Sequence, residues 1–290
     1  MSSFWGKTLK LSMFGEVQGH IVGGTLHDFP KGVTVNTDRI KLGLKLRQDV
    51  ATFTDAYKPE DTPTIISGIT GGVTNGAPIT IQFENKQMLD RHFSSYFSPR
   101  FTLPMVFFGM LAMDYLSQKG IHIVSHVKAI GETADDVLPP VYDKVLFDRL
   151  NSSPFAVINS ETKKRMVSLL TSLKATGDST TCKIQTVAVG LPKDLKSPLF
   201  DNLDARIARL VFPIPSVNGV CFDKVIDDTL VMTTSCRRTP TVAEQEARQY
   251  QVLDLDIKRN HVPCAVPRAT IVVTSAVALS ILDAMLEKNL

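Results

Sequence analysis

Glycines crowd one stretch near the start of the chain, where a glutamine and a histidine lie among them. Residues 13–32 read MFGEVQGHIVGGTLHDFPKG, with five glycines in twenty residues and no lysine–threonine pair of a nucleotide phosphate loop after them. Bare backbone permits close contact with a bound molecule. His20 can exchange a proton near neutral pH, whereas the amide of Gln18 cannot. His20 is therefore either a proton-transfer group or an ordinary surface histidine.

The overall composition is that of an ordinary globular protein. The 290 residues are 43% hydrophobic and 21% charged, with a net charge of +3. This charge is too small to indicate nucleic-acid binding, but small anionic ligands remain open. The first residues lack the apolar run of a signal peptide, and the most apolar segment, 101–111, contains Pro104 and Gly109 and is too short to cross a bilayer. We expect a soluble, cytoplasmic protein that binds neither membranes nor nucleic acid.

Cysteine spacing gives no sign of a metal site. Cys182, Cys221, Cys236 and Cys264 are widely separated and form no C-x-x-C pair. Such spacing argues against zinc and, in a reducing compartment, predicts buried free thiols. We expect no metal.

Short predicted strands and helices alternate along the chain, and a strand, hairpin and helix occur in that order twice. This pattern predicts an α+β fold in which helices pack between or beside antiparallel sheets. Thr37 is the predicted N-cap of the first helix. The predicted strands are 7–14, 64–69, 78–83, 121–130, 184–190, 217–222 and 230–234, and the predicted helices are 37–46, 103–118, 145–150, 160–175, 202–210 and 269–288.

Several segments, in order along the chain, resemble those of chorismate synthases. FGEVQGHIVGGTLHDFPKG is similar to the family's F-G-E-S-H-G signature, IISGITGGVTNGAPI to I-L-S-G-V-x-x-G-x-T-T-G-T-P-I, and SPRFT to S-A-R-E-T. In the second half, GLPKDLKSPLFDNLDA, RRTPTV and HVPC resemble G-x-P-x-G-L-G-x-P-x-F-D-x-L-D-A, K-P-T-x-S/T-I and R-H-D-P-C. The resemblance covers nearly the whole chain. It implies a sandwich of helices between antiparallel β-sheets, in a single domain spanning residues 1–290, and a homo-oligomer, usually a tetramer.

The resemblance also implies a reaction and its ligands. Chorismate synthases use reduced FMN for the anti-1,4-elimination of phosphate from 5-enolpyruvylshikimate-3-phosphate. Arg47, Ser98 and Arg100 fall on positions that bind the substrate, because arginine pairs well with phosphate and carboxylate. Arg237 and Thr241 fall on positions that bind FMN.

Three side chains on which the family reaction depends are missing. The histidine of F-G-E-S-H-G falls on Gln18, the aspartate of R-H-D-P-C falls on Val262, and a second histidine, in a G-H-A-D segment, has no counterpart. A glycine-rich insert before the K-P-T segment is also absent. His20 and His261 are the candidate replacements, and each can also be an ordinary structural or surface histidine.

This pattern leaves three alternative functions open. The first is an active chorismate synthase with altered proton donors. The second is a catalytically reduced paralogue that binds a flavin or a phosphorylated anion, and the third is a non-enzymatic oligomer partner. Under the first two, Arg47 and Arg100 face one cleft with an anion between them, since two guanidinium groups otherwise repel. In the alternative, each pairs with a local acid such as Asp49 or Asp90.

Overall fold

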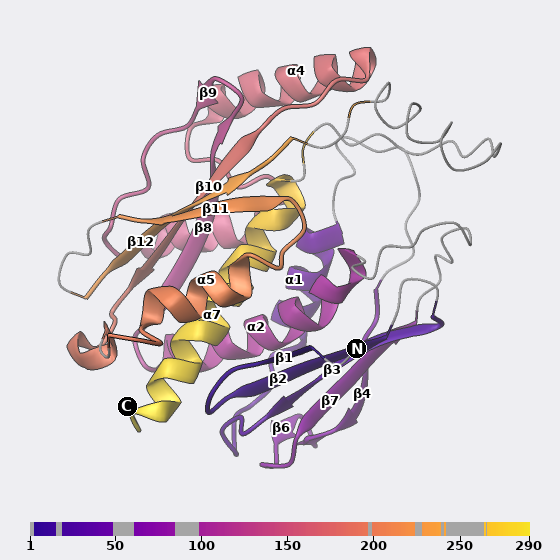
Figure 1. Cartoon of the computed structure of the whole chain (residues 1–290), viewed down its shortest axis with the longest axis vertical. Coiled ribbons are helices and arrows are strands. Elements are labelled where there is room, and N and C mark those ends of the chain that lie inside the picture. The colour runs from indigo at the N-terminus through magenta and orange to yellow at the C-terminus, as the bar shows by residue number, and fades with distance from the viewer. Residues whose placement is uncertain are drawn as a thin grey trace.

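The computed structural model describes residues 3–15, 19–48, 61–84, 99–196, 199–223, 228–238, 241, 264 and 266–290. Two five-stranded antiparallel sheets enclose a layer of helices (Figure 1). The predicted α+β architecture, with helices between antiparallel sheets, is confirmed.

The first sheet comes from the N-terminal part of the chain and has the strand order β1-β2-β3-β7-β4. Apolar residues alternate along β7, which buries Ile79, Ile81 and Phe83 against the helices, as a sheet with one covered face requires. A two-stranded hairpin, β5-β6, lies between β4 and β7 in sequence. The strands are β1 (Ser3–Trp5), β2 (Lys10–Gly15), β3 (Ile21–His27), β4 (Thr64–Ser67), β5 (Ile69–Thr70), β6 (Val73–Thr74) and β7 (Ile79–Glu84).

The second sheet has the order β11-β12-β10-β8-β9, so its central strand pairs with neighbours from both sides of the sequence. In β12, every second side chain is buried, beginning with Leu230 and ending with Cys236. This alternation places one face of the strand toward the helices. The strands are β8 (His122–Ile130), β9 (Thr133–Ala134), β10 (Cys182–Val189), β11 (Val217–Phe222) and β12 (Leu230–Cys236).

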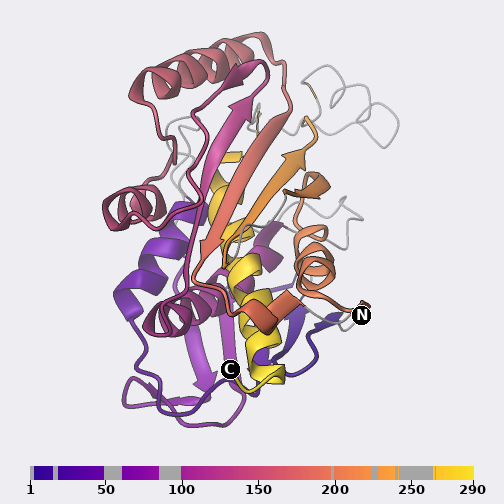
Figure 2. The ribbon, with the colours of Figure 1, turned by 90° about the vertical axis from the view of Figure 1, so that its left-hand side faces the viewer.

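Among the described helices, four form the middle layer and two lie outside it. In the middle layer, α2 packs on α7 and contacts β3, β7 and β8, while α7 also contacts β10. The turned view shows α4 at the end of the second sheet farthest from the first (Figure 2). The helices are α1 (Thr37–Gln48), α2 (Thr102–Gln118), α3 (Lys144–Ser152), α4 (Ser160–Thr176), α5 (Leu203–Val211) and α7 (Val266–Glu287), with 3-10 turns η1 (Pro99–Phe101) and η2 (Lys193–Lys196).

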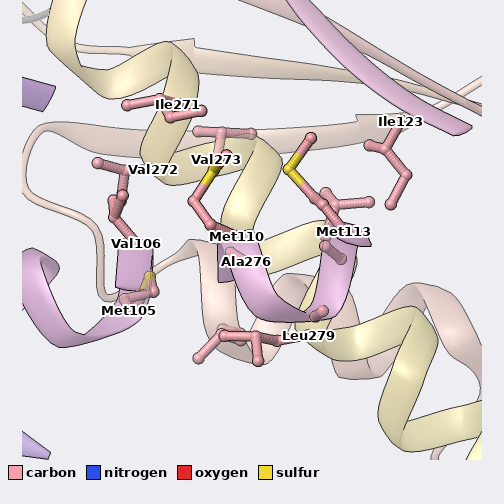
Figure 3. Packing of buried hydrophobic residues seen from close by; sticks show 14 of the residues in the cluster. Met105, Val106, Met110, Met113, Ile123, Ile271, Val272, Val273, Ala276 and Leu279 are labelled. Carbon is pink, nitrogen blue, oxygen red and sulfur yellow. The ribbon is translucent and has the colours of Figure 1, made fainter. Parts of the chain in front are cut away.

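The contact between α2 and α7 is the centre of the hydrophobic core. Methionine side chains of α2 interdigitate with branched side chains of α7 beside β8 (Figure 3). Gly109 permits the close approach, because a Cβ at this position would lie 2.2 Å from Cβ of Ser275. By length and composition α7 could cross a membrane, but its side chains are almost completely buried inside the protein. Here its apolar character is that of a core helix.

Two local predictions were wrong. The first helix is capped by Asn36, not Thr37: Asn36 Oδ1 accepts a hydrogen bond from the backbone N–H of Arg39 at 3.1 Å. Asn and Thr both cap helices well, so the adjacent pair was ambiguous in sequence.

Cys221 is exposed, whereas the other three cysteines are buried as expected. The reason is that Cys221 points outward from β11, on the face that the helices do not cover.

Candidate functional site

Arg47 and Arg100, which lie far apart in sequence, meet at one carboxylate. Arg47 belongs to the last turn of α1, and its Nη1 lies 3.5 Å from Oδ2 of Asp61. Arg100 belongs to η1, and its Nη2 donates to Oδ1 of Asp61 at 2.9 Å. The side chain of Asp61 is 8% exposed. The two arginines therefore converge, and each pairs with an acid of the chain as the alternative expected, although the acid is Asp61.

Further hydrogen bonds hold both guanidinium groups in place. Arg47 Nε donates to Oγ1 of Thr102 at 2.6 Å, at the start of α2. Arg100 Nη2 also donates to the carbonyl oxygen of Glu84 at 3.0 Å, at the end of β7. A helix end, a 3-10 turn and a strand end thus fix the positions of these two charges. Such preorganisation suits binding of an anion, because little side-chain ordering remains to be done.

A third arginine belongs to the same cluster. Burial lowers the pKa of Arg47 to about 10; Asp61 opposes this shift, and the charges of Arg100 and Arg268 add to it. Arg268 lies in the first turn of α7, and burial lowers its pKa as well. We call Arg47, Arg100, Arg268 and Asp61 the arginine cluster. Asp61 pairs with Arg47 and Arg100, and the charge of Arg268 acts on Arg47.

Sequence reasoning missed Arg268, although a signal was present. It is the only charged residue of α7 before Asp283, in a helix that is otherwise apolar. A charge at the start of a core helix needs a specific environment, because a buried cation without a counterion is costly. An isolated arginine at that position therefore marks a charged site near the helix start.

Several other predicted site residues are not brought to this cluster. His20 lies exposed just before β3. Ser98 and His261 lie outside the described residues, as do Gln18, Val262, Asp49 and Asp90. The roles expected for Ser98 and His261 therefore stay predictions.

The described residues do not build an FMN site around Arg237. Its backbone N–H donates to the carbonyl oxygen of Ser216 at 2.9 Å, which continues the pairing of β12 with β11. Alternation along the strand directs Cys236 toward the helices and Arg237, which is exposed, to the opposite face. Thr241 is half-buried. Arg237 thus faces away from the helical layer that holds Arg47 and Arg268, and this geometry does not fit a flavin placed against the arginine cluster.

One glycine of the N-terminal stretch has a packing role that its structure explains. A Cβ on Gly24 would lie 3.0 Å from Cβ of Pro104 and 3.2 Å from Cε2 of Phe108. Both belong to α2, so the bare backbone of β3 lets the first sheet approach this helix closely. At this position, glycine is explained by sheet–helix packing without any ligand.

A separate cavity lies between the end of α2, the start of β8 and α3, with a volume of about 200 Å³. Arg39, His122, Tyr142 and Asn151 are among the residues that line it. The ring of His122 stacks on that of Tyr142 at 3.8 Å, and Arg39 pairs with Asp114. Its main polar groups are thus engaged within the protein, and none of the arginine cluster lines it.

Comparison with known proteins connects this geometry to a family. The family model described as chorismate synthase matches residues 9–97 and 90–230. A chorismate synthase of Korarchaeum cryptofilum is 26% identical over 96% of this chain and 96% of its own length. One of Methanobrevibacter smithii is 26% identical over 100% of this chain and 98% of its own length.

A solved structure, described as the crystal structure of chorismate synthase, has the same fold. The TM-score is 0.78, with 20% identity, and the match covers 98% of this chain and 93% of that one. The family model spans well over half of the sequence, in segments that include Arg47 and Arg100. The chain therefore belongs to the chorismate synthase family.

Proposed function

We propose that this member of the chorismate synthase family binds a phosphorylated small anion of the 5-enolpyruvylshikimate-3-phosphate type at its arginine cluster, and turns it over much more slowly than a complete family enzyme. The observation that carries the proposal is that Arg47 and Arg100 converge on the carboxylate of Asp61, while the charge of Arg268 also acts on Arg47. Among these described groups cations outnumber acids, which suits a phosphate monoester, since it carries about −1.5 to −2 at pH 7.

The energetics of Arg47 support a binding role. Lowering its pKa from 12.5 to about 10 means that the folded protein holds this cation less favourably than water does, by on the order of 3 kcal/mol at neutral pH. If stability alone decided the residue at position 47, an apolar side chain would be favoured. An anion bound beside Arg47 and Arg268 offsets this cost, and Asp61 keeps Arg47 and Arg100 together for it.

Low turnover follows from the residues at the family's proton-transfer positions. Gln18 and Val262 cannot exchange protons near neutral pH, and positioned proton transfer typically contributes about 10²–10⁴-fold to a rate. Reduced FMN supplies a transient electron in the family reaction. We assign no step to it here, because Arg237 faces away from the arginine cluster. The family's tetrameric assembly and the cytoplasmic location stay predictions.

Binding is tested by thermal unfolding with added inorganic phosphate and with 5-enolpyruvylshikimate-3-phosphate. A ligand at ten times its Kd stabilises the folded state by about 1.4 kcal/mol. We expect this stabilisation in the wild type and its loss in Arg268→Gln. Arg209→Gln is the matched control, because Arg209 is exposed on α5 and its substitution removes the same charge. Equal stabilisation of both variants, or none in the wild type, contradicts the proposed site.

Turnover is tested separately, under anaerobic conditions with reduced FMN and 5-enolpyruvylshikimate-3-phosphate. We expect a rate at least about 10²-fold below that of a complete family enzyme assayed in parallel. FMN titration followed by fluorescence should show only weak binding. A comparable rate, or FMN binding in the low micromolar range, contradicts the attenuated reaction without affecting the anion site.

A further inference from the structure

Three of the four cysteines come together in the fold, although they are widely separated in sequence. Cys182 of β10 and Cys236 of β12 are direct partners in the antiparallel register. Cys264 lies two residues before α7. The three residues are 3%, 2% and 3% exposed. We call Cys182, Cys236 and Cys264 the thiol cluster.

The strand register brings Cys182 and Cys236 within the range of a disulfide. Residues opposite each other in an antiparallel pair have Cα atoms about 4.5–5.5 Å apart, and their side chains project on the same face. Disulfides span Cα distances of about 4.4–6.8 Å. Alternation in β12 directs Cys236 inward together with Met232, toward the helical layer. The strand register therefore permits a disulfide between Cys182 and Cys236.

The pKa values of Cys182 and Cys236 are shifted in opposite directions. Hydrogen bonds to the thiols of Cys236 and Cys264, together with burial, raise the pKa of Cys182 far above its usual range. The hydrogen bond with Cys182 lowers the pKa of Cys236, against the effect of burial. Cys236 is thus the thiol that loses its proton more readily, and the thiolate is the reactive form of cysteine.

Within the described part of the chain, no group of three or more His, Cys, Asp or Glu residues has an arrangement that could hold a metal ion. The chemistry open to adjacent thiols without a metal is oxidation to a disulfide.

We propose that Cys182 and Cys236 are an oxidation-sensitive dithiol, which closes a cross-strand disulfide when a hydroperoxide reaches it. The Cys236 thiolate attacks one peroxide oxygen, the O–O bond breaks, and hydroxide leaves a sulfenic acid on Cys236. The Cys182 sulfur then attacks the Cys236 sulfur, the S–S bond forms, and hydroxide leaves and takes up the thiol proton as water. Two thiols and one hydrogen peroxide thus give one disulfide and two waters, and the peroxide receives the two electrons.

Cys264 links the thiol cluster to the candidate site. Burial lowers the pKa of Arg268, Cys264 opposes this shift, and the charge of Arg268 in turn acts on Arg47. The oxidation step itself involves no arginine, so its test is independent of anion binding. Because the thiols are buried, oxidation proceeds through local opening and is slower than reaction of the exposed Cys221.

Cysteine mapping after oxidation tests the proposal. The experiment uses the Cys221→Ser protein, in which intermolecular bonds through Cys221 cannot form. The protein is treated with hydrogen peroxide, and the remaining thiols are then alkylated in denaturant. Peptide mass spectrometry should find Cys182 linked to Cys236, with Cys264 alkylated and the protein two hydrogen atoms lighter. Dithiothreitol should restore all three thiols.

Further variants locate the bond. Cys264→Ser should retain the link, whereas Cys182→Ser should lose it and leave Cys236 as a sulfenic acid that a dimedone probe traps. Full alkylation of all three thiols after prolonged oxidation overturns the proposal. So does a link between Cys264 and either other cysteine, or a bond found only between two chains. The mapping in the Cys221→Ser protein decides the matter even if Cys182→Ser does not fold.

Discussion

Arg206 and Arg47 are both buried in ion clusters, and the charge balance of the two clusters is opposite among the described residues. Arg206 of α5 is 5% exposed and meets three carboxylates, those of Asp201, Asp283 and Glu287. Arg47 shares the carboxylate of Asp61 with Arg100, and Arg268 adds a third positive charge. Among the residues that the structure describes, acids outnumber the cation in the first cluster, and cations outnumber the acid in the second.

The pKa values follow this balance. Burial lowers the pKa of Arg206, but the hydrogen bond to Glu287 and the charges of Asp283 and Asp201 outweigh burial and raise it. For Arg47, burial prevails and the pKa falls to about 10. A buried arginine surrounded by acids serves the fold, whereas one whose pKa falls on burial costs stability. The Arg206 cluster is therefore the structural one, and the arginine cluster is the proposed binding site.

Asp283 makes the structural cluster essential to the fold. It is 1% exposed, and its Oδ1 accepts the backbone N–H groups of Lys7, Thr8 and Leu9. Its Oδ2 accepts from Arg206 Nη1 at 2.9 Å. One carboxylate thus ties the N-terminal turn and α5 to α7.

The largest expected effect is that of Asp283→Ala. It leaves three backbone donors and one guanidinium nitrogen without their acceptor, so we expect unfolding free energy to fall by about 3–5 kcal/mol in urea titrations. Asp148→Ala is the control, because Asp148 pairs with Lys144 on the surface and should change stability little. Similar stabilities for the two variants would mean that the Arg206 cluster is not structural.

Asp61→Asn should have an intermediate effect of a different kind. The amide keeps a hydrogen-bond acceptor but removes the counterion, so we expect a loss of about 1–3 kcal/mol at low salt. Added phosphate should restore more stability to Asp61→Asn than it adds to the wild type, because it replaces the missing charge. Phosphate should not restore Asp283→Ala. Equal phosphate responses in all three proteins would erase the distinction between the clusters.

The smallest expected effect is a pH dependence from Glu287. The hydrogen bond from Lys7 lowers its pKa, burial opposes this, and Arg206 lowers it further. Because the folded pKa lies below the unfolded value of about 4.3, the contribution of Glu287 is fully present above that pH and is lost as pH falls through the folded pKa. Urea titrations should therefore find Glu287→Gln less stable than wild type at about pH 6, with a smaller difference near pH 3. A constant difference would show that Glu287 stabilises by packing alone.

Local pattern was enough to predict most helices and strands and the family. Local spacing predicts the apolar run of α2, the antiparallel pair of β4 and β7, and the alternation in β12. These patterns depend on residues two to four positions apart, and side chains at those distances share a face. The ordered motifs predicted the sandwich fold and the meeting of Arg47 and Arg100. For these features, the information lies within short segments or in their order.

Only the tertiary structure decided which side chains complete the sites. Sequence reasoning named Asp49 and Asp90 as possible partners of the arginines, but Asp61 lies between Arg47 and Arg100. It also did not predict that Arg268 joins them or that Cys182 lies opposite Cys236. These contacts depend on strand register and on how the start of α7 packs against the end of α1. Spacing along the chain carries no such information, because residues far apart in sequence become neighbours only when the sheets and helices pack.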